Sequence, residues 1–244
     1  MRMKPRVAVF WAFALLHGAA GPAFGCALPA DAETVRLAGL GPGGDPRLED
    51  GRLLRLVGLA PRQDEAEAAG FAGGISAYRS VPFRLMTLGD ADRWGRLPAR
   101  LVRADGGGNP DLAALLVGSG HAARFAEAGA DCIAWPKTGK ASQATLLDGH
   151  DPAALAGQAG RLVWLQGRIA SVGERRNWTY LNFSRRRGEA AAIMVSKTLW
   201  QELRRAGWTA RTLGGKRIRA QGILSGRDGL LLEVTARAAL EWVD

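Results

Sequence analysis

Alternating apolar and polar positions predict two groups of short β-strands, each combined with helices. In the first group the alternation is loose over 33–40 and clearer further along the chain. The other predicted strands are 53–61, 80–89 and 96–102, the predicted helices start at Asp64 and cover 110–125, and one more short strand is expected near 47–50. With that additional strand, the first group has the strand number of a small OB-type barrel.

The second group has the element order of an OB-fold, with three strands, one amphipathic helix and two further strands. These elements are predicted at 161–173, 178–186, 190–195, 197–207, 216–224 and 230–243. The sequence therefore predicts a mainly β chain with helices (α+β), built as two small five-stranded OB-type barrels in tandem. We expect the first barrel over 28–130, a linker over 131–157 and the second barrel over 158–244.

The amino-terminal residues have the pattern of a secretory signal peptide. Basic residues at Arg2, Lys4 and Arg6 precede an apolar run over 7–16, and small residues continue to Gly25. The apolar run is too short to span a bilayer. We therefore expect residues 1–27 to be a leader and the mature chain to be exported, either to a periplasm or out of the cell.

The end of the leader leaves two alternatives open. The sequence PAFGC resembles a lipobox ending at Cys26, with a bulky Phe24 where lipoboxes prefer small residues, and acylation there would anchor the chain to a membrane. Ordinary cleavage next to Gly25 or Ala27 is the alternative. A retained Cys26 could form a disulfide with Cys132 in an oxidising compartment, whereas cleavage after Ala27 would leave Cys132 as a lone thiol.

The positive charge is distributed unevenly along the chain. The formal net charge is +10, and residues 158–244 hold 16 lysines and arginines against seven acidic residues, whereas 28–157 hold 14 against 16. This asymmetry predicts a polyanionic partner for the second domain. The three histidines are scattered and there are only two cysteines, so neither a histidine-based triad nor a zinc site is indicated.

The segment DRWGR is the first candidate for chemistry. It forms a charged turn from Asp92 to Gly95 and leads into a predicted strand that begins at Arg96. An arginine at this position can present its planar donor group to a phosphate. The alternative is a solvated hairpin turn with a surface salt bridge.

Three segments together resemble the staphylococcal nuclease (thermonuclease) family. They read DGRLLRLVGLAP at 50–61, DRWGR at 92–96 and LVGSGHA at 116–122. The resemblance covers roughly 33–125, and DRWGR is its most specific part. It implies an OB-type barrel that hydrolyses nucleic-acid phosphodiesters with the help of calcium.

The resemblance assigns catalytic roles to three positions. Two arginines brace the scissile phosphate in that family, and Arg55 and Arg96 match them; the alternative for Arg55 is a strand arginine whose head reaches solvent. The catalytic glutamate aligns with Gln63, or with Arg62 if a gap is placed differently. Gln63 cannot act as a general base, so Asp64 and Glu65 would have to substitute through a shifted loop.

The resemblance also implies an impaired calcium site. One metal-binding aspartate of the family is replaced by Ala60, and the other aligns with Glu33, which could still act as a ligand. Calcium prefers six or more oxygen ligands, so the loss of one carboxylate weakens the site.

The second domain offers a candidate nucleic-acid surface. On the strand 178–182, Thr179 and Leu181 are expected to point inward, and Trp178 and Tyr180 outward. The arginines expected to accompany the two aromatic residues are Arg175, Arg176, Arg185, Arg186 and Arg187, with Arg217 and Arg219 on a later strand. Aromatic side chains beside basic residues bind single-stranded nucleic acid, at ~1–3 kcal/mol per stacked base. The alternative is that the aromatic residues pack against the first domain and the arginines keep the protein soluble.

Two functional hypotheses follow. The first is an exported thermonuclease-like enzyme that acts on nucleic acid by calcium-dependent phosphodiester hydrolysis. The second is a catalytically degenerate nuclease barrel that binds nucleic acid or an envelope partner, which includes a lipid-anchored scaffold if Cys26 is acylated. Neither hypothesis requires a small-molecule cofactor.

Overall fold

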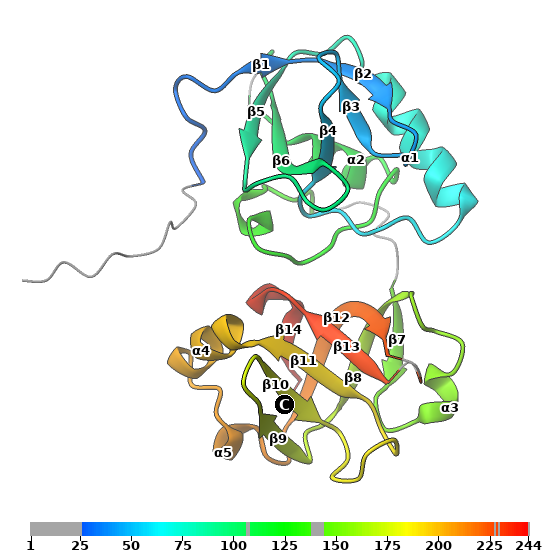
Figure 1. Cartoon of the computed structure of the whole chain (residues 1–244), viewed down its shortest axis with the longest axis vertical. Helices are drawn as coiled ribbons and strands as arrows, with labels where there is room; N and C mark the ends of the chain where they lie inside the picture. Colours follow the sequence, from blue (N-terminus) through cyan, green and yellow to red (C-terminus); the bar gives the residue numbers. More distant parts are fainter. Residues whose placement is uncertain (1–25, 106–107, 138–143, 227, 229, 244) are drawn as a thin grey trace, which may run out of the picture.

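A computed structural model describes residues 26–105, 108–137, 144–226, 228 and 230–243 of the chain. The predicted leader therefore lies outside the described residues, except for its last two positions. The chain is a mixed α+β structure, mostly β, and its strands form two sheets (Figure 1). This confirms the predicted fold class at that level. Among the described residues, no helix has the length and apolar character needed to cross a bilayer.

The first sheet has the strand order β1-β5-β6-β4-β3-β2. Its elements are β1 (Thr34–Val35), β2 (Leu37–Leu40), β3 (Pro46–Leu48), β4 (Leu53–Leu56), α1 (Glu65–Ala77), β5 (Phe83–Thr87), β6 (Arg96–Arg103), α2 (Leu112–Gly118) and the short 3-10 helix η1 (Ala130–Cys132). Strands β4 and β6 are parallel, and the other neighbours are antiparallel. The two end strands, β1 and β2, are consecutive in the chain and are separated only by Arg36.

Helix α1 connects β4 to β5. It begins after Asp64, whose carboxylate accepts a hydrogen bond from the N–H of Glu67, and it buries Phe71 and Ile75 in the core. A side chain at Gly74 would have its Cβ 2.7 Å from the side chain of Leu116 in α2. The glycine therefore allows the two helices to pack closely.

The second sheet has the order β7-β8-β12-β13-β11-β10-β9, and β14 also pairs with β12. Its elements are β7 (Thr145–Asp148), α3 (Pro152–Leu155), β8 (Leu162–Arg168), β9 (Ser171–Glu174), β10 (Trp178–Asn182), β11 (Ala192–Ser196), α4 (Lys197–Arg205), α5 (Ala210–Leu213), β12 (Arg217–Ser225), β13 (Leu231–Val234), η2 (Arg237–Ala239) and β14 (Leu240–Trp242). Strands β11 and β13 are parallel, and α4 follows β11 directly. This sheet thus repeats a feature of the first, in which β4 and β6 are parallel and are connected through a helix and one further strand.

The structure refines several predicted elements. The strand expected near 47–50 exists as β3, at Pro46–Leu48. The single strand expected over 230–243 is wrong: η2 divides it into β13 and β14, because the long strand β12 pairs with β13 along one half and with β14 along the other. The expected linker also contributes to the second sheet, since β7 pairs with β8 in parallel.

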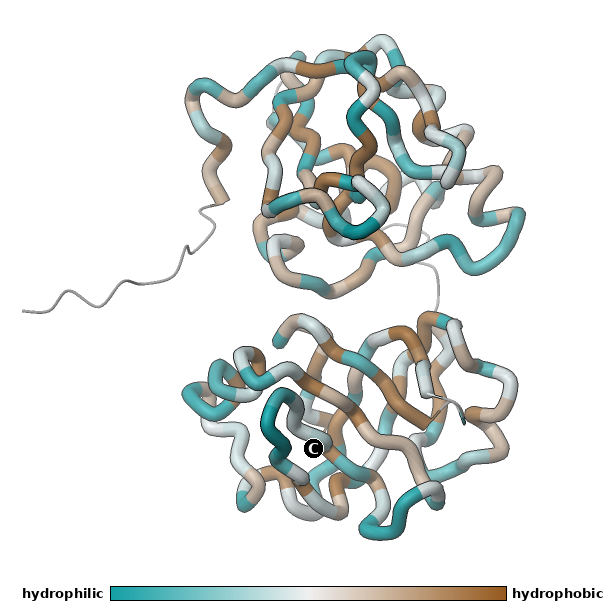
Figure 2. The backbone as a smooth tube through the Cα atoms, viewed as in Figure 1, coloured by the Kyte–Doolittle hydropathy of each residue, from teal (hydrophilic) through white to brown (hydrophobic). Residues whose placement is uncertain are grey.

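Each sheet has its own buried core. Leu54, Phe71 and Phe83 belong to the core of the first sheet, and a larger cluster that includes Phe183 and Trp200 fills the second. Figure 2 shows apolar residues along the strands and polar residues at the connecting loops. The side chains of Thr179, Leu181 and Phe183 are buried, as the alternation predicted.

Candidate functional site

Arg55 and Arg96 lie on neighbouring parallel strands of the first sheet. In the register of β4 and β6, Leu53 is opposite Arg96 and Arg55 is opposite Pro98. Both arginines line one pocket of about 260 Å³. The other residues that line it are Asp45, Pro46, Leu56, Leu59, Pro61, Arg62, Phe71, Phe125 and Glu127. The two arginines therefore line the same pocket, and the catalytic role that the resemblance implies for them stays a prediction.

Arg96 is held between two carboxylates. Its Nε donates to Asp92 at 2.9 Å and its Nη1 donates to Asp45 at 3.3 Å. Partial burial alone would raise the pKa of Asp92, but the hydrogen bonds from Arg96 and from the backbone N–H groups of Arg96 and Trp94 lower it below its ordinary value. The turn before β6 thus contains the salt bridge that we considered as the alternative to phosphate binding.

Arg55 is paired with Glu127, a residue 72 positions further along the chain. The Nη1 of Arg55 donates to Glu127 Oε2 at 2.7 Å, and the N–H of Gly58 donates to Glu127 Oε1 at 2.9 Å. The Glu127 side chain is only 12% exposed. Gly58 has a φ of +87°, and a Cβ there would lie 2.6 Å from the ring of Trp135. This backbone amide is therefore presented to Glu127 by a conformation that requires glycine.

Arg62 supplies the third guanidinium of the pocket. It lies 4.8 Å from the centre of the Phe71 ring, and its Nη2 is 3.7 Å from Asp45 and donates to the Gly44 carbonyl at 3.3 Å. The pocket therefore holds three arginines with two carboxylates among its lining residues. Each of these arginines has a carboxylate oxygen within 4 Å.

Gln63 does not lie in this pocket, and its expected place at the general-base position is wrong. Its Nε2 donates to the Pro61 carbonyl at 3.1 Å, and its Oε1 accepts from the N–H of Leu162 at 2.8 Å. Arg161 donates to the Gln63 carbonyl at 3.2 Å. The loop therefore contacts the start of β8, because the chain after Pro61 leads toward the second sheet. The nearby Asp64 caps α1, so it does not replace a catalytic base in this conformation.

Glu33 also lies away from the pocket, contrary to its expected role as a metal ligand. Its carboxylate pairs with Arg52 at 2.7 Å and is more than half exposed. Within the described part of the chain, no group of three or more His, Cys, Asp or Glu side chains is arranged to hold a metal ion. The carboxylates of Asp45 and Glu127 form salt bridges with Arg96 and Arg55, respectively. With these carboxylates already paired, the pocket does not fit a calcium ion.

A groove of about 640 Å³ lies on the second sheet. Tyr180 and Asn182 of β10 line it, together with arginines from the β9–β10 and β10–β11 loops. These arginines are Arg175, Arg185, Arg186 and Arg187, which we call the arginine groove together with Tyr180. Figure 2 shows both loops as strongly hydrophilic.

The charge of the arginine groove is largely uncompensated. Among the described residues, Arg186 is the only groove arginine with an ion pair, to Glu189 at 3.2 Å, and it is highly exposed. Asp228 also lines the groove, where it accepts from the N–H of Leu230 at 3.2 Å. The groove therefore combines an aromatic ring with four guanidinium groups and one lining carboxylate.

The remaining predicted nucleic-acid residues lie outside the groove. Trp178 and Arg176 are not among its lining residues. Arg217 lines a separate pocket with His150, and Arg219 donates to Gln166 and lies 3.8 Å from Glu241. Arg217 and Arg219 are thus not brought to the groove, because β12 is separated from β10 by β13 and β11 in the sheet order, and a phosphate contact by either stays a prediction.

Comparison with known proteins does not place the chain in a family. No protein-family model matches it, and no curated protein is significantly similar to it. The resemblance to thermonucleases therefore depends on the sequence motifs alone.

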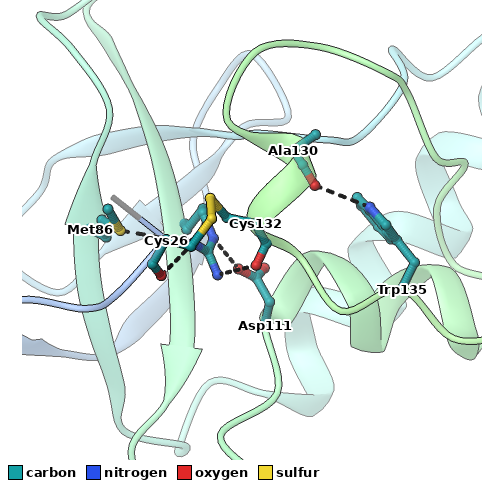
Figure 3. Close-up of a disulfide and its surroundings, with 7 residues drawn as sticks. Cys26, Met86, Asp111, Ala130, Cys132 and Trp135 are labelled. Carbon is teal, nitrogen blue, oxygen red and sulfur yellow. Dashed lines mark hydrogen bonds and ion pairs between the residues drawn. A yellow bond between two sulfur atoms is a disulfide. The ribbon is translucent and has the colours of Figure 1, made fainter. Parts of the chain in front are cut away.

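A disulfide joins Cys26 to Cys132 (Figure 3). The guanidinium of Arg100 donates to the Cys132 carbonyl at 3.0 Å and to Asp111 at 2.9 Å. Burial raises the pKa of Asp111, and the Ala113 N–H and Arg100 oppose that shift. A sulfur atom in a disulfide cannot also carry a thioether-linked lipid, so the disulfide and a lipid anchor at Cys26 exclude each other.

The sequence did not indicate Asp45 and Glu127 as partners of the pocket arginines. Asp45 lies in a glycine- and proline-rich turn, and Glu127 lies in an irregular segment after α2. Neither position belongs to a periodic pattern or to a segment of the resemblance. A search for carboxylates opposite Arg55 and Arg96 could not have selected these two among the acidic residues of the first domain.

Proposed function

We propose that this chain is a nucleic-acid-binding protein that holds single-stranded nucleic acid in the arginine groove of its second domain. The observation that carries the proposal is one groove lined by Tyr180 and four arginines, with little compensating negative charge. Guanidinium groups would contact the phosphates, and the tyrosine ring would stack on a base. The excess of positive charge in residues 158–244 would attract the strand at a distance.

The strand order supports an OB-type barrel for this domain. Strands β8 and β9 follow each other in the chain; β8 pairs with β12, and β9 pairs with β10. Taken together, β8 and β9 would form one bent first strand that pairs with β12 through its first part and with β10 through its second, and such a strand would close the sheet on itself. The same argument applies to β1 and β2, which are the two ends of the first sheet. OB barrels bind oligonucleotides across the second and third strands and the adjoining loops, where the arginine groove lies.

The test is binding of a fluorescent single-stranded oligonucleotide at several salt concentrations. We expect the combination of Arg175→Ala and Arg187→Ala to lower the slope of log K against log [salt] by about 1.4, that is ~0.7 per lost phosphate contact. Tyr180→Ala should weaken binding by ~1–3 kcal/mol with little change in the slope. The matched control combines Arg217→Ala and Arg219→Ala on β12. If the control weakens binding as much as the groove variant, the groove is not the binding site.

The convergence of Arg55 and Arg96 supports a second candidate function, phosphodiester hydrolysis of the thermonuclease type. Two guanidinium groups in one pocket could stabilise the charge of a phosphoryl transition state. The residues present give no general base in the pocket and do not fit calcium, so this candidate ranks below binding. Digestion of single-stranded DNA with calcium and with chelator tests it, with Arg96→Ala and, as control, Arg93→Ala. Chelator-sensitive cleavage that Arg96→Ala abolishes would make the chain an enzyme.

We also propose that the chain is exported. The amino-terminal pattern supports a leader, and the disulfide supports an oxidising compartment. Because the disulfide uses Cys26, cleavage would occur at or before the bond between Gly25 and Cys26. Intact mass of the mature protein tests this, and a mass that lacks Cys26 would contradict it.

A further inference from the structure

The pocket of the first domain contains a carboxylate where an anionic ligand would be expected. Glu127 reaches Arg55 from a segment after α2, and its two oxygens accept from two different donors, one guanidinium and one backbone N–H. A guanidinium group beside a backbone amide is an arrangement that binds phosphate oxygens. Glu127 therefore satisfies the same donors that an oxyanion would use.

The backbone around Glu127 holds its contact with Arg55 in place. The N–H of Phe125 donates to the Gly58 carbonyl at 2.8 Å, so the segment that carries Glu127 is hydrogen-bonded to the residue that receives it. Gly129 has a φ of +86°, and a Cβ there would lie 2.8 Å from Leu88. The backbone on both sides of Glu127 is thus fixed by close contacts. The Arg55 side chain remains 36% exposed at the pocket, so solutes can reach it.

The other pocket arginines differ from Arg55. Arg96 has two carboxylates, and both of its neighbours, Asp92 and Asp45, would remain if Glu127 were removed. Arg62 is 3.7 Å from Asp45, a long distance for an ion pair. Loss of the Glu127 charge would therefore leave Arg55 without a carboxylate and raise the positive charge of the pocket by one.

We infer that Glu127 is an internal competitor for anions, and that its carboxylate determines whether the pocket at Arg55 admits a phosphate group. Removal of its charge should convert a closed, internally paired pocket into a phosphate-binding site. The inference concerns the first domain and does not depend on the arginine groove, whose binding is measured with a single-stranded oligonucleotide.

The experiment measures binding of inorganic phosphate to the full chain by calorimetry. Glu127→Gln keeps the size of the side chain and an oxygen that can accept from Gly58, but it removes the charge. We expect roughly tenfold tighter phosphate binding than in the unmodified chain, the size of one charge-assisted contact. The matched control is Asp105→Asn, which removes a carboxylate from the exposed pair with Arg103, outside the pocket. It should leave phosphate binding unchanged.

Two results would overturn the inference. One is phosphate binding by Glu127→Gln within twofold of the unmodified chain. The other is a gain that persists when Arg55→Ala is added, because the new site would then not involve Arg55. If Glu127→Gln does not fold, the unmodified chain still gives a test. A large excess of phosphate should compete with the Glu127 carboxylate for the N–H of Gly58 and shift its amide resonance in an NMR spectrum, and a resonance that stays unchanged at the highest phosphate concentration would contradict the proposal.

Discussion

The two domains use arginine in opposite ways. In the first domain, Arg52, Arg55, Arg96, Arg100 and Arg103 each pair with a carboxylate within 3 Å. In the arginine groove of the second domain, Arg186 alone has an ion pair among the described residues, and that pair is exposed. The same residue type therefore holds the first domain together and leaves the second with charge available to a partner.

The two regions differ in how much of the arginine charge is already compensated by carboxylates. Arg55 and Arg96 of the first domain line one pocket, but carboxylates compensate their charge. The second lacks a recognisable catalytic motif, yet its groove retains unpaired charge. Arginines that are already paired must exchange one anion for another, whereas unpaired arginines gain a new contact.

The largest effect is expected at the buried pair of Arg100 and Asp111, which are 7% and 3% exposed. Arg100→Met leaves a buried carboxylate without its partner, which costs ~3–5 kcal/mol of unfolding free energy. Denaturant unfolding of the full chain measures this. The matched control is Arg103→Met, whose pair with Asp105 is at the surface, and it should cost far less. Equal losses for the two variants would contradict a structural role that depends on burial.

The disulfide is expected to have the next largest effect, and only in the first domain. It links positions 106 residues apart, and removal of such a bond typically costs ~2–5 kcal/mol. Cys132→Ser should therefore speed hydrogen exchange in β4–β6 while leaving exchange in β10–β13 unchanged. Treatment with a reductant should destabilise the unmodified chain but not Cys132→Ser. Loss of protection in both sheets would show that the domains do not unfold separately.

Asp92 should give a smaller effect that depends on pH. Because the folded-state pKa of Asp92 is lowered, its contribution to stability is complete above its unfolded-state pKa of about 3.9 and is lost as the pH falls through the folded-state pKa. Asp92→Asn should thus lower the melting temperature at neutral pH, and the difference should shrink below about pH 4. The exposed Asp90 provides the control, as Asp90→Asn should leave the melting temperature at neutral pH nearly unchanged. A constant difference across the range would contradict the assignment.

The smallest effect on stability is expected in the arginine groove. Arg175 and Arg187 have no ion pair among the described residues. Replacement of either by Gln should therefore change the unfolding free energy by less than ~0.5 kcal/mol. Thermal unfolding checks this. A large loss would mean that these arginines maintain the fold, and the contrast between the two domains would fail.

Local patterns allowed the second domain to be predicted well. The alternation in β10 placed Thr179 and Leu181 inside, and α4 buries Leu199, Trp200 and Leu203 as its helical spacing indicates. These predictions succeeded because each depends on residues that are close in sequence and on one repeating geometry. The sequence did not predict that the last strand is divided into β13 and β14, because this division depends on which part of β12 is free to pair.

The first site could be predicted only in part. The strands that carry Arg55 and Arg96 are neighbours and both arginines line one pocket, while the catalytic role that the resemblance implies for them stays a prediction. The resemblance misplaced Gln63, because the course of a loop depends on what it packs against, here the start of β8. Glu127 could not be predicted, because its contact joins an irregular segment to a residue 72 positions away.

The bond between Cys26 and Cys132 encloses the whole first sheet in one covalent ring. A single proteolytic cut between residues 27 and 131 would therefore open the ring without releasing a fragment, and the nicked chain would keep its mass, apart from one water molecule, until a reductant was added. One cut in this part of the chain therefore leaves all of its strands covalently connected.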